Sequence, residues 1–212
     1  TKDTELRTVG RWLLLVVLAL LALQVFFIGR IALMAVLAPQ STTFQRSEAW
    51  RLASSGSLRW SQRWLPYDEI SDSLKRAVIA SEDDDFINHD GVEWEAIEQA
   101  WARNTKAEEA AAKRAEKNLP ARPMKIRGGS TITQQLAKNL LLSGERTLLR
   151  KGQELVLTYT LEQLLSKRRI LEIYLNNVEW GEGVFGAEAA AQHYFRKSAS
   201  RLSAYEAARL AV

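Results

Sequence analysis

The apolar positions of this chain begin with one long run near the N-terminus. Leu13 to Gly29 carry no charge, Arg30 interrupts them, and residues 31–38 continue the apolar stretch to Pro39. At about 1.5 Å per residue the uncharged part spans roughly 26 Å. Adding residues 31–38, with Arg30 reaching toward the headgroups, makes it long enough for a hydrocarbon core of roughly 30 Å. We therefore predict a transmembrane anchor over residues 12–38, after a short cytoplasmic tail, 1–11.

A cleaved signal peptide and a buried core helix are the alternatives for this run. It is too long for the apolar part of a signal peptide, and Pro39 after "VLA" makes a poor cleavage site. Lys2, Arg7 and Arg11 favour a cytoplasmic N-terminus. The arginines beyond the run weaken that orientation: Arg46, Arg51, Arg59 and Arg63. From about Pro39 onward, we expect a soluble domain held at a membrane surface.

Beyond Pro39 the apolar residues recur with a period of 3.6, and strand-like alternation is scarce. The pattern predicts helices over 69–81, 92–103, 131–142, 148–166, 168–177 and 184–195. Ser203 and Glu206 form a capping box that begins a last helix. The stretch 103–127 is charged and has almost no apolar stripe, so we expect a solvated insertion rather than a second domain. The predicted fold class is mainly α.

The amino-acid composition of the chain limits the classes of ligand and partner that it is expected to bind. The 212 residues, with 47% hydrophobic and 25% charged, suit one domain with a real core plus an appendage. The net charge of +4 suggests an anionic partner, but no nucleic-acid-binding motif or long basic run is present, so nucleic acid is not expected. The chain has no cysteine, and its two histidines, His89 and His193, argue against a structural metal.

The segment "GGSTITQQLAKN", residues 128–139, carries the first candidate chemistry. Its glycines permit close backbone approach, and Thr131 with Gln134 fits a capping box whose exposed N–H groups attract an anion. No GxxxxGK[ST] sequence is present for a nucleotide. One face of the following helix carries Gln135, Lys138 and Asn139. Taken alone, the segment fits a capped amphipathic helix without a ligand equally well.

Two carboxylates occupy contrasting sequence environments. Glu82 directly follows the apolar "RAVIAS", so we expect partial desolvation to raise its pKa toward the range of a general base. Glu154 shares a helical face with Arg150 and Lys151, and Arg146 lies a turn earlier. These cations should hold the pKa of Glu154 down, although a surface ion-pair ladder is the alternative. Two carboxylates with opposed environments are typical of a glycosyl-transfer site.

Four stretches, in this order and spacing, resemble the signature motifs of the family 51 peptidoglycan glycosyltransferases: "EDDDFINHDG", "GGSTITQQLAKN", "RKGQE" and "KRRILEIYLNNVEWGEGVFGAEAAAQHYF". The short chain with one anchor resembles the monofunctional members. The resemblance implies a lysozyme-like, two-lobed, largely helical domain over residues 39–212, with 103–127 where members have a mobile segment over the cleft. The family domain normally continues with further helices, so we expect this one to be truncated at Val212.

The resemblance also implies site residues. Glu82 matches the general base that deprotonates the acceptor's 4-hydroxyl, and Glu154 matches the glutamate that organises the donor site. The positions matching contacts to the donor pyrophosphate and sugars are Ser130, Gln135, Lys138, Asn139, Arg146, Arg150 and Lys151. The positions expected to support the Glu82 loop and the donor segment are Asp83, Phe86, His89, Gly128 and Gly129.

The activity implied by the family is elongation of glycan strands from lipid II by inverting glycosyl transfer, with release of undecaprenyl pyrophosphate. The implied location is the bacterial inner membrane, crossed once, with the catalytic domain on the periplasmic or outer side. The partners expected are lipid II, the growing lipid-linked strand and the membrane, and other cell-wall synthesis proteins stay open. No cofactor is expected to be required, and a divalent cation, Mg²⁺ or Mn²⁺, stays open.

Three other functions are compatible with parts of the sequence. A lysozyme-like peptidoglycan hydrolase would have the fold and a glutamate, but no use for the cations around Glu154. A membrane-anchored scaffold would explain the anchor but not the paired acids. A glycosyltransferase fragment of a bifunctional penicillin-binding protein also stays open, because only the reading frame beyond Val212 distinguishes it.

Overall fold

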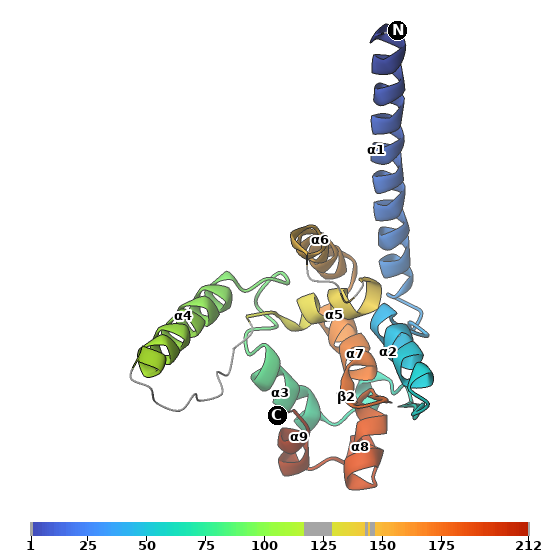
Figure 1. The fold of residues 1–212 in the computed structure, drawn as a ribbon. Helices are drawn as coiled ribbons and strands as arrows, with labels where there is room; N and C mark the ends of the chain where they lie inside the picture. Colours follow the sequence, from blue (N-terminus) through green and yellow to red (C-terminus); the bar gives the residue numbers. More distant parts are fainter. Residues whose placement is uncertain (1, 117–128, 143, 145–146, 212) are drawn as a thin grey trace.

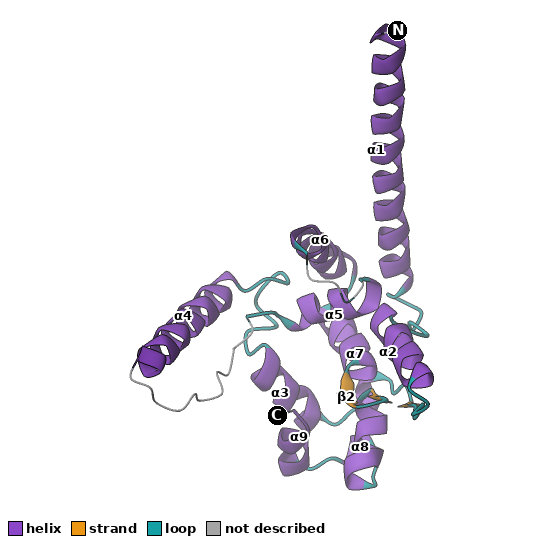
Figure 2. Cartoon of the chain, in the orientation of Figure 1, coloured by secondary structure: helices purple, strands orange, loops and turns teal. Residues whose placement is uncertain are grey.

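Helices dominate the structure, a computed structural model that describes residues 2–116, 129–142, 144 and 147–211 (Figure 2). This confirms the mainly α prediction. The first helix, α1 (Lys2–Leu33), projects away from the rest of the chain, and its segment Arg7–Leu33 is long and apolar enough to cross a membrane (Figure 1). A single-pass membrane anchor at the N-terminus fits this helix.

The C-terminal end of α1 is part of the domain core. Phe27, Ile31 and Met34 are buried in the main hydrophobic cluster, together with apolar residues from the helices described below. The Nε of Arg169 also donates a hydrogen bond of 2.7 Å to the backbone oxygen of Met34. The anchor and the domain therefore share an apolar core, and the predicted boundary at residues 38–39 lies beyond these contacts.

The core is built around α5 (Ile132–Leu141), which packs against α2 (Thr43–Ser54), α6 (Leu148–Leu164) and α7 (Lys167–Asn177). Ile132, Leu136 and Leu140 are fully buried, which confirms the predicted apolar stripe. The capping box of Thr131 and Gln134 is also confirmed. The sequence prediction missed α2, although Thr42 and Gln45 form the same kind of capping box at its start.

The last helix, α9 (Ala204–Ala211), packs along α3 (Asp72–Glu82), so the C-terminal part of the described chain lies beside the helix that ends at Glu82 (Figure 1). The predicted capping box of Ser203 and Glu206 is confirmed, because Glu206 N–H donates to Ser203 Oγ while Ser203 N–H donates to the Glu206 carboxylate. Two short 3₁₀ helices complete the connections: η1 (Tyr67–Glu69) and η2 (Ala199–Arg201).

A small sheet lies where the pattern predicts the start of a helix at residue 184. Strand β3 (Val184–Phe185) runs parallel to β1 (Ser61–Gln62) and antiparallel to β2 (Glu179–Gly181), in the order β1-β3-β2. Helix α8 (Ala187–Phe195) begins only after Gly186, whose φ is 82°. A Cβ there would lie 2.6 Å from the backbone oxygen of Asn176, so this turn requires glycine.

Helix α4 (Trp94–Glu116) is longer than predicted and extends into the charged segment. Alanine, glutamate and lysine are strong helix formers, so residues 103–116 continue the helix without an apolar stripe. The remaining residues of the segment, 117–127, lie outside the described part of the chain. In Figure 1, α4 extends away from the core on the side opposite α1.

Candidate active site

Glu82 is the last residue of α3, and its side chain is exposed. The predicted partial desolvation of Glu82 is therefore wrong. Helix α3 ends at this residue, and the extended Asp83 that follows points into the protein instead, with 5% of its surface exposed. The Nε2 of Gln135, on α5, donates a hydrogen bond of 2.8 Å to Glu82 Oε2. The carboxylate is thus held at one oxygen and accessible at the surface.

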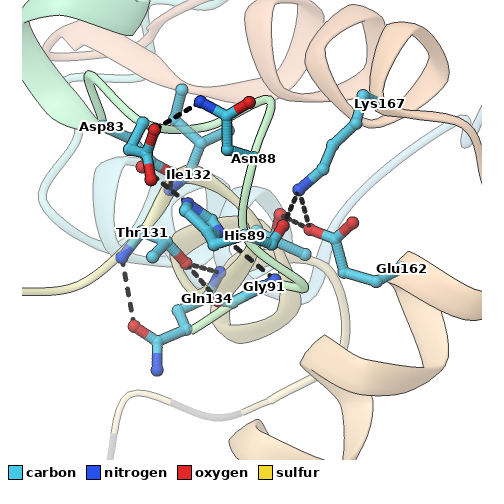
Figure 3. A network of polar contacts seen from close by, with 11 residues as sticks. Asp83, Asn88, His89, Gly91, Thr131, Ile132, Gln134, Glu162 and Lys167 are labelled. Atoms are coloured by element: carbon cyan, nitrogen blue, oxygen red, sulfur yellow. Dashed lines mark hydrogen bonds and ion pairs between the residues drawn. The ribbon is translucent and has the colours of Figure 1, made fainter. Parts of the chain in front are cut away.

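Asp83, the residue that follows Glu82, and His89 form a buried clamp (Figure 3). One Asp83 oxygen lies 2.8 Å from His89 Nε2, and the other accepts the backbone N–H of Ile132 at 2.9 Å. Since His89 Nδ1 accepts the N–H of Gly91 at 3.0 Å, its ring proton lies on Nε2 and is donated to Asp83. This clamp ties the end of α3 to the first turn of α5.

The loop that carries His89 is fastened at two further points (Figure 3). Thr131 Oγ1 donates to the backbone oxygen of Gly91 at 2.6 Å. The ammonium of Lys167 donates to the backbone oxygen of His89 at 2.6 Å and to Glu162 at 2.8 Å. It also lies 4.7 Å from the ring centre of the buried Phe86. The sequence pattern did not predict that Lys167 contacts this loop.

One group of side chains is close enough together to coordinate a metal ion: Asp83, His89 and Glu93. One ligand atom of each lies within 4.8 Å of the others. Burial raises the pKa of Glu93, and the charges of Asp83 and Asp84 raise it further. However, both oxygens of Asp83 and both ring nitrogens of His89 already have hydrogen-bond partners. These residues do not fit a metal without breaking the clamp.

Glu154 is buried on α6 and paired with two cations. Its side chain is 4% exposed, Arg150 Nη1 lies 3.3 Å from one oxygen, and Lys151 Nζ contacts the other. The Nε of Arg150 is buried without a partner among the described residues. The ion pairs expected from the sequence are therefore present, but Glu154 and not Glu82 is the desolvated carboxylate.

A cavity of about 440 Å³ lies between α5 and α6 beside this ion-pair group; we call it the cationic cavity. Its lining comprises Ser130, Gln134, Gln135, Lys138, Thr147, Leu148, Arg150, Lys151 and Glu154. Three cationic side chains against one carboxylate give it a positive balance, which suits an anionic ligand. Lys138 and Arg150 also border a neighbouring cavity of about 540 Å³ that includes Asn139.

Glu82 borders two further cavities. A larger one of about 590 Å³ runs from Glu82 past Tyr174 and is walled by Trp180 and Tyr194. A smaller one of about 260 Å³ contains Glu82 and Ser130. Ser130 also lines the cationic cavity, and Gln135 lines it while donating a hydrogen bond to Glu82. The site therefore joins an accessible carboxylate to a region lined by cations.

Gly129 packs against helix α4, and this contact is what requires a glycine. A Cβ at this position would lie 2.9 Å from the Cα of Ile97 and 3.1 Å from the backbone oxygen of Ala96. The close backbone approach expected from the sequence is therefore made to α4. Gly128 and Arg146, the other two residues predicted for this region, lie outside the described part of the chain.

Tyr174 joins the site although its place in an apolar helix pattern suggests only a core residue. Its hydroxyl donates to Gln135 Oε1 at 3.1 Å, so Tyr174, Gln135 and Glu82 form one hydrogen-bonded series. Burial raises the pKa of Tyr174, and the nearby charges of Glu82 and Asp83 raise it further. One signal for this role was available, since the hydroxyl of a tyrosine in a core helix generally needs a polar partner.

Comparison with known proteins identifies the family. The family described as "Transglycosylase" matches residues 51–212. The chain belongs to the transglycosylase family. Transglycosylases are glycosyltransferases, so the chain is an enzyme, and this membership favours a transferase over the hydrolase and scaffold alternatives. The match includes every described site residue named above, from Glu82 to Tyr174.

Curated relatives of this transglycosylase extend over nearly the whole chain. The biosynthetic peptidoglycan transglycosylase of Cupriavidus pinatubonensis is 54% identical, covering 100% of this chain and 79% of the relative. The proteins of the same name from Burkholderia thailandensis and Cupriavidus metallidurans are 52% and 55% identical, covering 99% and 92% of this chain and 78% of each relative. The similarity therefore includes α1 as well as the catalytic region.

Proposed function

We propose that this transglycosylase polymerises the glycan strands of peptidoglycan from lipid II at a membrane surface. The observation that carries the proposal is the accessible carboxylate of Glu82, which Gln135 connects to the cationic cavity. The names of the relatives support peptidoglycan as the product. Lipid II suits the site for two reasons. A carboxylate can take the proton of its sugar hydroxyl, and cationic side chains can bind its pyrophosphate.

In the proposed reaction, Glu82 takes the proton of the acceptor's 4-hydroxyl. The acceptor oxygen attacks the anomeric carbon of the lipid-linked strand and forms the new glycosidic bond. The bond between that carbon and the pyrophosphate oxygen breaks, and undecaprenyl pyrophosphate leaves with the electron pair. Because the acceptor oxygen attacks the face opposite the departing pyrophosphate in a single displacement, the anomeric configuration inverts.

The cationic cavity would hold the pyrophosphate during this step. Lys138, Arg150 and Lys151 are the cations on its wall, and the unpartnered Nε of Arg150 is a donor placed for a ligand oxygen. Charge that develops on the leaving oxygen is stabilised by cations already in position. Ser130 and Asn139 border the same region and would contact phosphate or sugar oxygens.

Glu154 would organise these cations and not act as the base. Each oxygen of its largely buried carboxylate is already paired with Arg150 or Lys151, so the group is not free to take a proton from an acceptor hydroxyl. The clamp of Asp83 and His89, with Phe86 packed below it, would fix the end of α3 and hence the position of Glu82. The two carboxylates thus have separate tasks.

The proposed location is a bacterial inner membrane crossed once by α1, with the catalytic domain on the outer side. Lys2, Arg7 and Arg11 at the start of the helix support a cytoplasmic N-terminus. Lipid-linked sugars on the outer surface would then lie close to α6, which borders α1. The sequence contains no GxxxxGK[ST] motif and the donor carries its own pyrophosphate leaving group, so we also propose that no nucleotide is consumed.

The test is polymerisation of purified lipid II by the full-length protein without nucleotide. We expect Glu82→Gln to retain binding of the donor and lose about 10²–10⁴-fold in kcat, because an amide fills the space but cannot take a proton. Glu98→Gln, an exposed carboxylate on α4, is the matched control and should keep its activity. Near-normal turnover by Glu82→Gln would refute the base assignment. Soluble muropeptides from finished peptidoglycan, without polymer, would refute the transferase.

A further inference from the structure

The membrane helix and the helix of the donor site are joined by a pair of glutamines. Gln24 Nε2 donates to Gln153 Oε1 at 2.9 Å, and Gln153 Nε2 donates back to Gln24 Oε1 at 3.0 Å. Both residues are half-buried, so the reciprocal bonds lie in the contact between α1 and α6. We call this pair the glutamine clasp.

Gln24 lies in the apolar part of α1, where a polar side chain in hydrocarbon is energetically unfavourable. Between Trp12 and Gly29 it is the one side chain with an amide, and all the charged residues lie outside that stretch. It stands 12 residues, or about 18 Å, along the helix from Trp12, which is within a hydrocarbon core of roughly 30 Å. An amide in hydrocarbon needs a hydrogen-bond partner, and Gln153 supplies both a donor and an acceptor.

The clasp acts on the helix that carries the cationic cavity. Gln153 directly precedes Glu154, and Arg150 lies one turn earlier on α6. Below the clasp, Phe27 and Ile31 pack into the core. Helix α1 therefore contacts the domain at two positions along its axis, the clasp and the apolar residues Phe27 and Ile31. These two contacts fix its rotation and its depth relative to α6.

We propose that the glutamine clasp is a positioning device that holds the cationic cavity at a set depth beside the membrane. Gln24 and Gln153 touch no reacting atom; they act through α6 on Arg150, Lys151 and Glu154. A lipid-linked pyrophosphate is confined to the membrane surface, so the depth of the cavity controls how often its cations meet it. This inference rests on the proposed function of the cavity as the donor site.

The kinetic test compares Gln24→Leu, Gln153→Leu and the double variant in full-length protein, on lipid II in liposomes and in detergent micelles. Each single variant leaves one amide unpaired, so we expect KM in liposomes to rise about three- to tenfold. The value of kcat should be unchanged because the contacts of Glu82 are intact. The rise in KM should be smaller in micelles than in liposomes. Gln163→Leu, exposed on the same helix, is the matched control.

The double variant separates positioning from packing. Two leucines restore an apolar contact, so thermal stability should recover, but they cannot restore the directional pair, so KM in liposomes should stay high. A double variant with wild-type KM would overturn the proposal, because packing alone would then suffice. Single variants with unchanged KM would also overturn it.

Cross-linking tests the geometry without an activity assay. The chain has no cysteine, so Gln24→Cys with Gln153→Cys creates a unique pair for a short bismaleimide in membranes. Efficient cross-linking supports the clasp. Equal cross-linking of Ala22→Cys with Gln153→Cys would overturn it, because Ala22 faces the opposite side of α1. If wild-type protein failed to polymerise lipid II while the pair still cross-linked, the proposed function would fail and the contact would stand.

Discussion

At the residue scale, the polar side chains around Glu82 are oriented by hydrogen bonds between segments that are distant in the sequence. Gln135 uses both ends of its amide, donating to Glu82 and accepting from Tyr174. The Tyr174 hydroxyl is protonated across the physiological range, because the ordinary pKa of tyrosine is about 10 and burial raises that of Tyr174 further. The tyrosine therefore determines which way the Gln135 amide points, and hence that an N–H group faces the carboxylate.

We expect Tyr174→Phe to lower kcat about three- to tenfold, because Gln135 loses the donor that fixes its orientation and one net hydrogen bond is removed. The measurement is steady-state polymerisation together with thermal unfolding. Tyr205→Phe, an exposed tyrosine on α9, serves as the control and should change neither quantity. An unchanged kcat for Tyr174→Phe would show that the Gln135 amide is oriented without it.

At the element scale, α9 depends on a capping interaction that responds to pH. The Glu206 carboxylate accepts hydrogen bonds from Ser203 and from Lys197, and Lys197 first, then Ser203, lower its pKa to about 2. A carboxylate with a depressed pKa in the folded state stabilises the fold above its unfolded pKa of about 4.3. That contribution is lost as the pH falls toward 2. Since α9 packs along α3, the cap also supports the helix that ends at Glu82.

We expect Glu206→Gln to lower the melting temperature at pH 7, because the amide cannot replace the charged partner of Lys197. The difference from wild type should shrink as the pH is lowered from about 4.5 toward 2, where the wild-type carboxylate becomes protonated. Thermal unfolding at a series of pH values measures this, with the exposed Glu109→Gln on α4 as the control. A difference that stays constant over this range would contradict the pKa assignment.

At the scale of the whole molecule, α1, the helix long and apolar enough to cross a membrane, is also part of the core of the catalytic domain. Phe27, Ile31 and Met34 lie at 8%, 0% and 4% exposure in the main core, so the domain cannot lose them without leaving a cavity. Under the proposed function, such an anchor would raise the local concentration of enzyme and lipid-linked substrate in addition to stabilising the fold.

Two truncations distinguish these contributions. Deleting residues 1–23 should keep turnover in micelles and reduce it in liposomes, because the buried end of α1 is retained. Deleting residues 1–38 should also lower the melting temperature and turnover in micelles, since each lost core side chain costs roughly 2–5 kcal/mol. Replacing Phe27, Ile31 and Met34 by alanine in the full-length chain is the control for folding without loss of the anchor. Equal melting temperatures for the two truncations would contradict a shared core.

Elements that depend on local pattern could be predicted from the amino-acid sequence. The apolar run at the N-terminus, the stripe of Ile132, Leu136 and Leu140, and the capping boxes at Thr131 and Ser203 follow from periodicity and from side chains three residues apart. The pairing of Glu154 with Arg150 and Lys151 is equally local, because all three lie within two turns of one helix. The candidate site residues came from short local motifs that resemble those of a known family.

The burial of each carboxylate and the hydrogen bonds that connect the site depend on the packing of distant segments. Desolvation depends on what packs over a residue, so the apolar neighbours of Glu82 in sequence did not predict its exposure at the end of α3. Tyr174 reaches Gln135 across 39 residues of sequence, and Gln153 reaches Gln24 across 129. Contacts over such separations arise from the packing of whole helices, which one-dimensional periodicity does not encode.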